Sequence, residues 1–291
     1  MEQKIYLNGE FLSRKEAKIS VYDHGLLYGD GVFEGLRTYN GRIFKLQEHM
    51  DRLYKSAKYI CLDIPLTREK LINAVVKTAQ LNGYRDCYLR VVVTRGEGDL
   101  GLAPEKCKSS TLFIIVDKIE LYPEKFCKEG IEIITVPTQR NASHNLEPRV
   151  KSLNYLNNIL AKIEATNSGF KEAIMLNREG FVTECTADNI FIVENDIIKT
   201  PSTHMGALDG ITRKTVIEIA KKLSIQAKEE ILSRYDLFNA DECFLTGTAA
   251  EIIPIIKIDG RIIGDGKVGK DTKKIRAAFK KLIDTDGTPY L

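Results

Sequence analysis

The chain of 291 residues is long enough for two domains with a core each, and its net charge of +3 at pH 7 is slight. So small a charge excludes the strongly basic classes of protein that bind nucleic acids or membrane surfaces. No apolar run reaches the roughly 18 residues of a membrane-spanning helix, and the first residues lack the apolar core of a signal peptide. The cysteines stand apart without a CxxC pair, so we expect buried thiols in the cytoplasm and no disulfide or metal site; they are Cys61, Cys87, Cys107, Cys127, Cys185 and Cys243.

Two Asn-Gly pairs predict tight hairpins near the N-terminus. Asn8-Gly9 separates two short apolar pieces, and Asn40-Gly41 follows the predicted strand 36–39. Asn-Gly suits a two-residue turn because both positions take positive φ. Between the hairpins, the stretch 23–37 contains glycines at 25, 29, 31 and 35 with Tyr28 and Phe33 among them. Because glycine permits close backbone approach, we interpret this stretch as a glycine loop leading into a strand.

Apolar spacing then predicts helices over 46–60 and about 67–82, the second ending at Gly83. Arg52 lies off the apolar face of the first helix. Strands are predicted over 87–94 and 110–117, and Arg90 is unusual within the first because a charge in an apolar strand is costly without a partner or ligand. The glycine loop 96–102 carries Leu100 and Leu102, which we expect to be exposed. The polar, proline-containing stretch after residue 118 is the candidate linker.

The stretch 149–163 combines a lysine with the pattern of an amphipathic helix. Apolar residues recur at 153, 156, 160 and 163, which predicts a helix with Ser152 as N-cap and Gly169 as its stop. This pattern puts Lys151 at the helix start, where the helix dipole disfavours a cation. Lys151 is therefore a candidate for a desolvated amine that forms Schiff bases, with Tyr155 one turn later; a solvated surface lysine is the alternative.

The remaining elements are predicted to be three hairpins, over 172–184, 189–200 and 255–263, and a closing helix from about residue 270. Glu184 ends a strand of the first hairpin. Two turns have the composition of anion sites: Gly210-Ile-Thr-Arg opens a helix that runs to Leu223 with Thr212 as N-cap, and Thr246-Gly-Thr-Ala-Ala-Glu follows the strand 241–245. Neither has a nucleotide-binding glycine spacing, and ordinary caps and turns have the same composition.

Taken together, several sequence words resemble the class IV aminotransferases, the fold-type IV enzymes that use pyridoxal 5'-phosphate (PLP), and within them the branched-chain aminotransferases. The resemblance covers essentially the whole chain. The words are Tyr28-Gly-Asp-Gly-Val-Phe-Glu-Gly, Glu48-His-Met-Asp-Arg-Leu, Lys151-Ser-Leu-Asn-Tyr-Leu, Glu184 with Asp188-Asn-Ile-Phe, Gly210-Ile-Thr-Arg and Gly247-Thr-Ala-Ala-Glu. The resemblance implies an α+β, two-domain fold of the D-amino acid aminotransferase type. A smaller N-terminal α/β domain (1–118), a linker (119–130) and a larger PLP-binding domain with a barrel-like sheet (131–291) are expected.

The resemblance also assigns roles to single residues. Lys151 is expected to form the Schiff base with PLP and then to move protons, while Tyr155 donates to the phenolic oxygen of the cofactor. Glu184 is expected to face the pyridine nitrogen, where its charge keeps the nitrogen protonated. The residues implied to hold the phosphate and the ring are Arg52, Ile211, Thr212, Thr248 and Leu208.

For the substrate, the resemblance implies that Arg90, Tyr88 and the Thr248–Ala249 amides receive the carboxylate. Phe33 and Tyr28 are expected to form an apolar wall, which Leu102 of a neighbouring subunit completes. The implied assembly is a homodimer or a homohexamer built as a trimer of dimers. One departure concerns Cys185 and Ala187, which stand where many relatives have glycine; we expect an extended backbone that tolerates both.

The implied reaction is transfer of the amino group of L-leucine, L-isoleucine or L-valine to 2-oxoglutarate, in a cytoplasmic enzyme whose partners are small amino acids and 2-oxo acids. Two alternatives share the fold. D-amino acid transaminases commonly carry Leu where Tyr155 stands and Tyr where Phe33 stands, and aminodeoxychorismate lyases eliminate pyruvate. A third alternative is a protein that binds PLP without catalysis, against which the retention of Lys151, Glu184 and Arg52 weighs.

Overall fold

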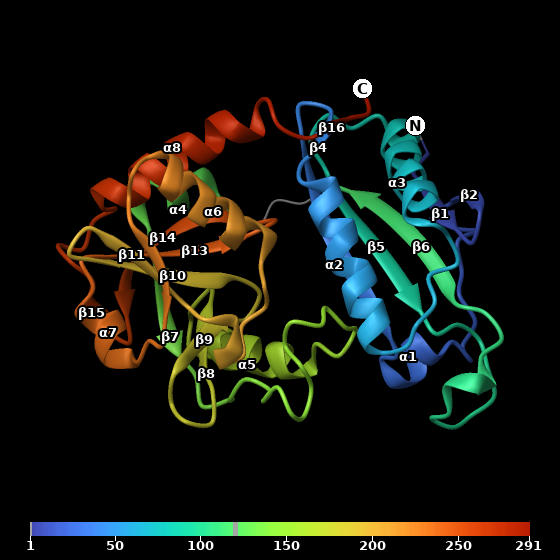
Figure 1. Cartoon of the computed structure of the whole chain (residues 1–291), viewed down its shortest axis with the longest axis horizontal. Helices are drawn as coiled ribbons and strands as arrows, with labels where there is room; N and C mark the ends of the chain where they lie inside the picture. Colours follow the sequence, from blue (N-terminus) through green and yellow to red (C-terminus); the bar gives the residue numbers. More distant parts are fainter. Residues whose placement is uncertain (1, 119–121) are drawn as a thin grey trace. The chain divides into compact units, whose positions relative to one another are not determined.

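The computed structural model describes residues 2–118 and 122–291, which divide into two compact units. Among them, the first unit contains the residues up to 118 together with 150–154 and 283–291. The second unit contains 122–149 and 155–282. Each unit therefore draws on more than one segment of the chain, and each is described by itself below (Figure 1).

The first unit is a seven-stranded sheet, in the described residues, with order β16-β4-β3-β5-β6-β1-β2. Its strands are β1 (Lys4–Leu7), β2 (Glu10–Ser13), β3 (Gly31–Tyr39), β4 (Arg42–Ile43), β5 (Tyr88–Thr94), β6 (Thr111–Asp117) and β16 (Thr288–Pro289). Its helices are α1 (His24–Tyr28), α2 (Leu46–Tyr59), α3 (Arg68–Asn82) and the 3-10 turn η1 (Pro104–Lys106). Both predicted Asn-Gly hairpins are confirmed, with Asn8, Gly9, Asn40 and Gly41 all at positive φ.

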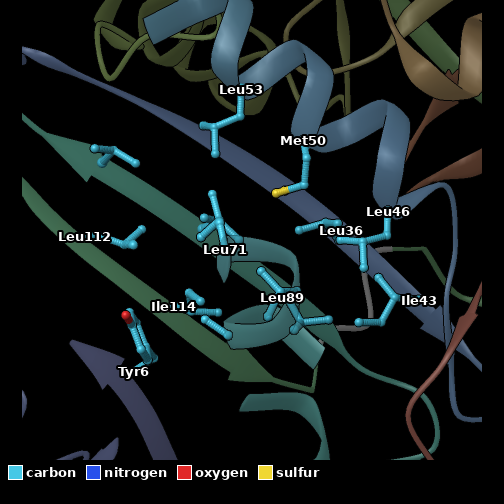
Figure 2. Packing of buried hydrophobic residues seen from close by; sticks show 14 of the residues in the cluster. Tyr6, Leu36, Ile43, Leu46, Met50, Leu53, Leu71, Leu89, Leu112 and Ile114 are labelled. Atoms are coloured by element: carbon cyan, nitrogen blue, oxygen red, sulfur yellow. The ribbon is translucent and has the colours of Figure 1, made fainter. Parts of the chain in front are cut away.

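Helices α2 and α3 cover one face of this sheet because their apolar sides match its alternation. Figure 2 shows Leu46, Met50 and Leu53 of α2 pointing toward the sheet, with Leu71 of α3 beside them. The sheet side of this core comes from residues of one parity, among them Leu36, Leu89, Leu112 and Ile114. The predicted end of α3 is confirmed, since Gly83 takes the left-handed conformation there. The helix begins at Arg68, and the Thr67 hydroxyl caps it.

The second unit is a curled nine-stranded sheet, in its described residues, with order β12-β11-β10-β13-β14-β7-β8-β9 and β15 paired to β14. Its strands are β7 (Ile131–Thr135), β8 (Ala173–Leu176), β9 (Val182–Cys185), β10 (Asn189–Glu194), β11 (Ile197–Pro201), β12 (Ala227–Glu230), β13 (Glu242–Gly247), β14 (Glu251–Ile258) and β15 (Arg261–Ile262). Its helices are α4 (Glu124–Glu129), α5 (Leu156–Asn167), η2 (Thr203–Met205), α6 (Ile211–Lys222), α7 (Arg234–Phe238) and α8 (Lys270–Ile283). The last strand β9 also lies against β10 and β11, so the sheet closes toward the expected barrel.

Several sequence predictions need correction. Helix α5 begins at Leu156 with Tyr155 as N-cap, so Ser152 is not a cap; it forms a bridge with Val32, and Lys151 is not at a helix start. Helix α6 has Gly210 as N-cap, so Thr212 lies in the first turn. Local pattern could not reveal the change at α5, because the 150–154 segment is drawn to β3 by backbone hydrogen bonds.

Helix α5 also differs from its predicted packing. Its buried residues are Asn158, Ala161 and Ala165, whereas the apolar stripe of Leu156, Ile159, Leu160 and Ile163 is exposed. Small and amide side chains allow the helix to approach β8 closely. The amphipathic pattern is therefore real, but its apolar side is not covered by this chain in the described residues.

The structure also differs from the predictions for the loop 23–37, the linker and the cysteines. The loop 23–37 contains the short helix α1, and the predicted linker 119–130 contains α4, while residues 119–121 lie outside the described residues. All six cysteines are free, but only Cys87, Cys185 and Cys243 are buried; Cys107 and Cys127 are half-buried and Cys61 is exposed, so the expectation of buried thiols fails for these three. No helix in the described part of the chain is long and apolar enough to span a membrane.

Candidate active site

The segment 150–154 fills the open edge of β3 in the first unit. Phe33 donates its N–H to the Lys151 carbonyl at 3.0 Å, and Leu153 donates to the Gly31 carbonyl at 3.0 Å. A side chain at position 31 would clash with Leu153, so glycine is needed for this approach. The Lys151 N–H is held by the Ser56 hydroxyl of α2 at 3.1 Å. Lys151 is thereby fixed on both sides by backbone contacts, although no helix starts there.

The strand alternation of β3 places different chemistry on either side of Lys151. Phe33 points away from the α2 face, and the Lys151 Nζ lies 4.7 Å from the centre of its ring. The Arg90 guanidinium lies 4.4 Å from the centre of the same ring and 5.8 Å from the ring of Tyr88. The structure thus brings the predicted residues Phe33, Tyr88, Arg90 and Lys151 together. Arg90 is half-buried on this open face and not fully buried, as the apolar run had suggested.

On the α2 side, Glu34 is the centre of a buried ion cluster. Its carboxylate accepts from Arg52 Nε at 2.7 Å and Nη2 at 2.9 Å, and from His49 Nδ1 at 2.7 Å. Burial acts to raise the pKa of Glu34, but the Arg52 charge, with His49 and the hydrogen bonds, outweighs it and holds this pKa below its usual range. Burial lowers the pKa of His49, so His49 is neutral at pH 7 and donates from Nδ1. Arg52 is therefore oriented by a fixed carboxylate, and not a surface residue.

Tyr28 lies apart from this group, beside the loop that carries Leu102. Its hydroxyl accepts the Gly101 N–H at 3.0 Å, and its ring contacts His24 edge-on at 4.9 Å. The His24 ring is in turn within 3.0 Å of the Asp99 carbonyl. Leu100 and Leu102 are exposed as predicted, Leu102 at 78%. The structure therefore places Tyr28 beside the exposed loop.

In the second unit, Glu184 is held by three donors although it is almost fully buried. Arg140 Nη2 lies 2.8 Å from Oε1, while Oε2 accepts from the Leu208 N–H at 2.8 Å and from Asn189 Nδ2 at 3.2 Å. Arg140 is itself fixed, since Nη1 donates to Asn158 Oδ1 at 2.9 Å. A buried carboxylate needs this number of partners. The strand-end carboxylate is thus a structured group, and not a solvated one.

Asn189 connects Glu184 to both predicted anion turns. Its amide also donates to the Leu208 carbonyl at 2.9 Å, and its backbone pairs with Thr246 in the register of β10 and β13. Leu208 lies three residues before α6, and Thr248 lies in the turn between β13 and β14. A side chain at position 210 would clash with Asn189 Oδ1, so the N-cap carries none. Glu184, Leu208, Ile211, Thr212 and the Thr248–Ala249 turn are thereby gathered in one part of this unit, where Tyr155 is the N-cap of α5.

Cys185 and Ala187 follow Glu184 without positive φ, as expected for an extended backbone that tolerates residues other than glycine. The Cys185 N–H donates to the Asp188 carbonyl at 2.8 Å and closes the turn. Burial raises the pKa of the Cys185 thiol well above its usual value, so it stays neutral.

Comparison with known proteins agrees with this arrangement. The family model described as Amino-transferase class IV matches residues 31–258, which include both residue groups. The chain belongs to the class IV aminotransferases. Among relatives of this family, a protein of Methanocaldococcus jannaschii provisionally named as a branched-chain-amino-acid aminotransferase is 54% identical over 279 residues, 96% of each chain.

Solved structures of class IV aminotransferases share the fold. The crystal structure of the Escherichia coli branched-chain amino acid aminotransferase has a TM-score of 0.95 at 33% identity, covering 98% of this chain and 97% of that one. The T.th. branched-chain amino acid aminotransferase complexed with N-(5'-phosphopyridoxyl)-L-glutamate has a TM-score of 0.92 at 36% identity, covering 98% and 95%. The expected fold class is confirmed.

Sequence reasoning assigned no role to Glu34, His49, Arg140 and Asn189. Three of them stand inside the motif words quoted above. Glu34 follows Phe33 and Asn189 follows Asp188, while His49 lies three positions before Arg52. Arg140 lies in the stretch 136–149 between two recognised elements, 44 positions before Glu184, and no local pattern signals it.

Proposed function

We propose that this class IV aminotransferase is a PLP-dependent branched-chain amino acid aminotransferase, transferring the amino group of L-leucine, L-isoleucine and L-valine to 2-oxoglutarate. The observation that carries the proposal is the buried Glu184, held by three donors next to an uncapped helix start, in a chain similar over nearly its full length to proteins named for this activity. The T.th. relative, complexed with a phosphopyridoxyl-glutamate compound, supports both the cofactor and the glutamate product.

The residues of the second unit fit a phosphopyridine. Helix α6 has twelve residues and no side-chain cap, so its first N–H groups suit the phosphate, together with Thr212 and Thr248. The Thr246 hydroxyl, beside that turn, is buried and has no hydrogen-bond partner among residues 2–118 and 122–291. Glu184 suits a protonated ring nitrogen because its carboxylate is charged and immobile, and Leu208, bonded to it, is placed to pack against the ring. Tyr155 would donate to the phenolic oxygen.

The residues of the first unit would supply a positive charge that binds the phosphate and the amine that reacts. PLP, when bound, provides an electron-poor ring that accepts the electron pair left by loss of the α-proton. Lys151 Nζ would bind the cofactor and later carry that proton, and its backbone anchors keep the amine in place. Arg52 would add a positive charge to the phosphate site, in the orientation that Glu34 gives its guanidinium.

Substrate choice follows from the contrast between Arg90 and the apolar wall. Arg90, supported by Tyr88 and the Thr248–Ala249 amides, would hold the α-carboxylate, and Phe33 would face the side chain. Exchanging those groups, as a D-amino acid requires, would leave Arg90 without its carboxylate. An unpaired desolvated charge costs several kcal/mol, so discrimination of about a hundredfold or more is expected.

The exposed apolar residues support an assembly of at least two subunits. Leu100 and Leu102 lie in one loop, whose Gly101 N–H donates to the Tyr28 hydroxyl of α1, and the stripe on α5 adds four more large apolar residues. We infer a homodimer or a trimer of dimers in which Tyr28 and this loop, with Leu102, complete a neighbouring subunit's substrate wall. The proposed compartment is the cytoplasm, since all six cysteines are free.

The test is kcat/KM with 2-oxoglutarate as acceptor for L-leucine, L-valine, D-leucine and D-alanine, and separately the release of pyruvate from aminodeoxychorismate. L-leucine and L-valine should lie within about a hundredfold of each other, since one methylene is worth about 1–3 kcal/mol. D-alanine equal to L-leucine would move the protein to the D-amino acid transaminases, and pyruvate release would move it to the lyases. A bound cofactor without any turnover would favour a binding protein.

A further inference from the structure

A separate cavity of about 460 Å³ opens in the second unit, away from the residues assigned to the cofactor. It lies between the end of β7, the turn from β8 to β9, helix α7 and the turn from β14 to β15. Its apolar lining includes Val136, Leu176 and Phe238. Cavities of this size hold small organic molecules when a few polar groups converge on them.

Three arginines converge on this cavity from three elements. Arg178 stands in the turn from β8 to β9, Arg234 begins α7, and Arg261 begins β15. The Arg261 guanidinium is preorganised, because it lies 4.3 Å from the centre of the Phe238 ring and donates to the Asp259 carbonyl at 3.0 Å. Within residues 2–118 and 122–291, none of the three forms an ion pair, and the side chains of Arg178 and Arg234 make no hydrogen bond.

One carboxylate, Asp259, also lines the cavity, and within the described residues it forms no ion pair with the three arginines. Asp259 uses its two oxygens on Thr135, accepting from the backbone N–H at 2.6 Å and from the hydroxyl at 2.8 Å. The lining therefore combines three guanidinium groups and one carboxylate with apolar side chains. Guanidinium groups bind phosphate and carboxylate by paired N–H donors, with a geometry that lysine does not offer.

We propose that this cavity is a binding site for a small organic dianion, with a phosphomonoester as the best-fitting class. Two negative charges match the excess of guanidinium groups over carboxylates, and the body of the ligand packs on Val136, Leu176 and Phe238. The proposal does not depend on the aminotransferase substrate, because none of the cofactor or substrate residues lines the cavity.

The test is isothermal titration of the holoenzyme with phenyl phosphate at low salt, after unbound PLP has been removed by gel filtration, so that the cofactor's own phosphate site is filled and the cavity is not. Binding with Kd of about 1 mM or tighter is expected. Arg178→Gln combined with Arg234→Gln should weaken it by about tenfold or more, and these side chains make no contacts that folding needs. Arg14→Gln, which removes an exposed arginine of the first unit, is the matched control and should change nothing.

Two further probes separate the ligand sources. Phthalate, a dicarboxylate of similar size, binding tenfold more weakly than phenyl phosphate supports the phosphomonoester class, while the reverse order overturns that choice. Phenol, which lacks the charge, should not bind. The site itself is overturned if phenyl phosphate gives no binding up to about 10 mM, or if the double variant binds it as the wild type does.

Discussion

Glu34 shows how a single carboxylate organises the charges of the first unit. It lies on the core face of β3, fully buried, and each of its oxygens accepts from Arg52 while His49 adds a third donor. Removing one partner of such a pair leaves a buried charge alone, which typically costs about 3–5 kcal/mol. We therefore interpret the cluster as a device that orients the Arg52 guanidinium.

We expect His49 to make stability sensitive to mild acid. The folded pKa of His49 is lowered by burial, so as pH falls below about 6.5 the unfolded chain takes up the proton first and stability is lost, at up to about 1.4 kcal/mol per pH unit. Urea unfolding of the wild type and of His49→Gln at pH 7.5 and 5.5 measures this. The wild type should lose more on acidification than the variant, since the contributions of the other histidines cancel. Equal losses would contradict the assignment of a neutral buried His49.

Glu184→Gln should lower kcat by about two orders of magnitude or more, because a neutral amide cannot keep the ring nitrogen protonated. It should also lower the melting temperature, since Arg140 loses its counter-charge. Steady-state kinetics with L-leucine and thermal unfolding measure the two effects. Glu179→Gln, in the exposed turn from β8 to β9, is the control and should behave as the wild type. A variant at position 184 with normal kcat would reduce Glu184 to a structural partner of Arg140.

Lys151→Ala should abolish turnover while PLP still binds through its phosphate contacts. The backbone anchors of residue 151 do not use its side chain, so the variant should fold. Borohydride reduction and peptide mapping of the wild type should place the cofactor on Lys151. Lys58→Ala, an exposed lysine of α2, is the control. A reduced adduct on any other lysine would refute the role of Lys151.

At the scale of elements, α2 serves two purposes at once. One side packs Leu46, Met50 and Leu53 into the core (Figure 2). Arg52 and His49 of the same helix donate to Glu34. Residues three and four apart lie on one side of a helix, so the positions 46, 49, 50 and 53 share a face that contacts the sheet. Substitutions that change how α2 packs on the sheet should therefore disturb both the core and the orientation of Arg52.

Met50→Ala should destabilise the protein by about 2–5 kcal/mol, because Met50 is fully buried and its removal leaves a cavity under α2. Urea unfolding of the protein checks this. Lys55→Ala, on the exposed side of the same helix, controls for helix propensity and should change stability by less than about 0.5 kcal/mol. A small effect of Met50→Ala would mean that the core relaxes around the gap.

At the scale of the whole molecule, the apolar residues left exposed are grouped. The stripe on α5 and the loop with Leu100 and Leu102 are too extensive for scattered surface residues. The stripe follows helical spacing, which normally marks a buried face. We propose that burial between copies of the chain accounts for both patches.

Light scattering should report a dimer or a hexamer. Leu160→Lys, in the middle of the α5 stripe, should shift the population to smaller species, because it places a charge in an apolar interface. Leu223→Lys is a matched control, since that leucine is exposed to a similar degree (43% against 47%) but lies at the end of α6. A fully active monomeric wild type would refute the assembly.

The sequence by itself determined those features that depend on neighbouring residues: the two Asn-Gly hairpins, the end of α3 at Gly83, and the motif words with their family. An Asn-Gly turn and a helix-ending glycine depend on the φ values of those residues themselves, so no distant contact is needed to form them. The assignment of Lys151 was reached through the family words, since the helix start first inferred for it does not exist.

Only the tertiary structure decided which partners meet across the chain. Arg52 pairs with Glu34, 18 positions away, and Arg140 with Glu184, 44 positions away. Whether the 150–154 segment continued into a helix or joined β3 was settled by the open edge of that strand, whose backbone groups need partners. The side of α5 that faces β8 was likewise set by the fit of Asn158, Ala161 and Ala165, because close packing there favours small side chains over large apolar ones. The apolar stripe is therefore left exposed.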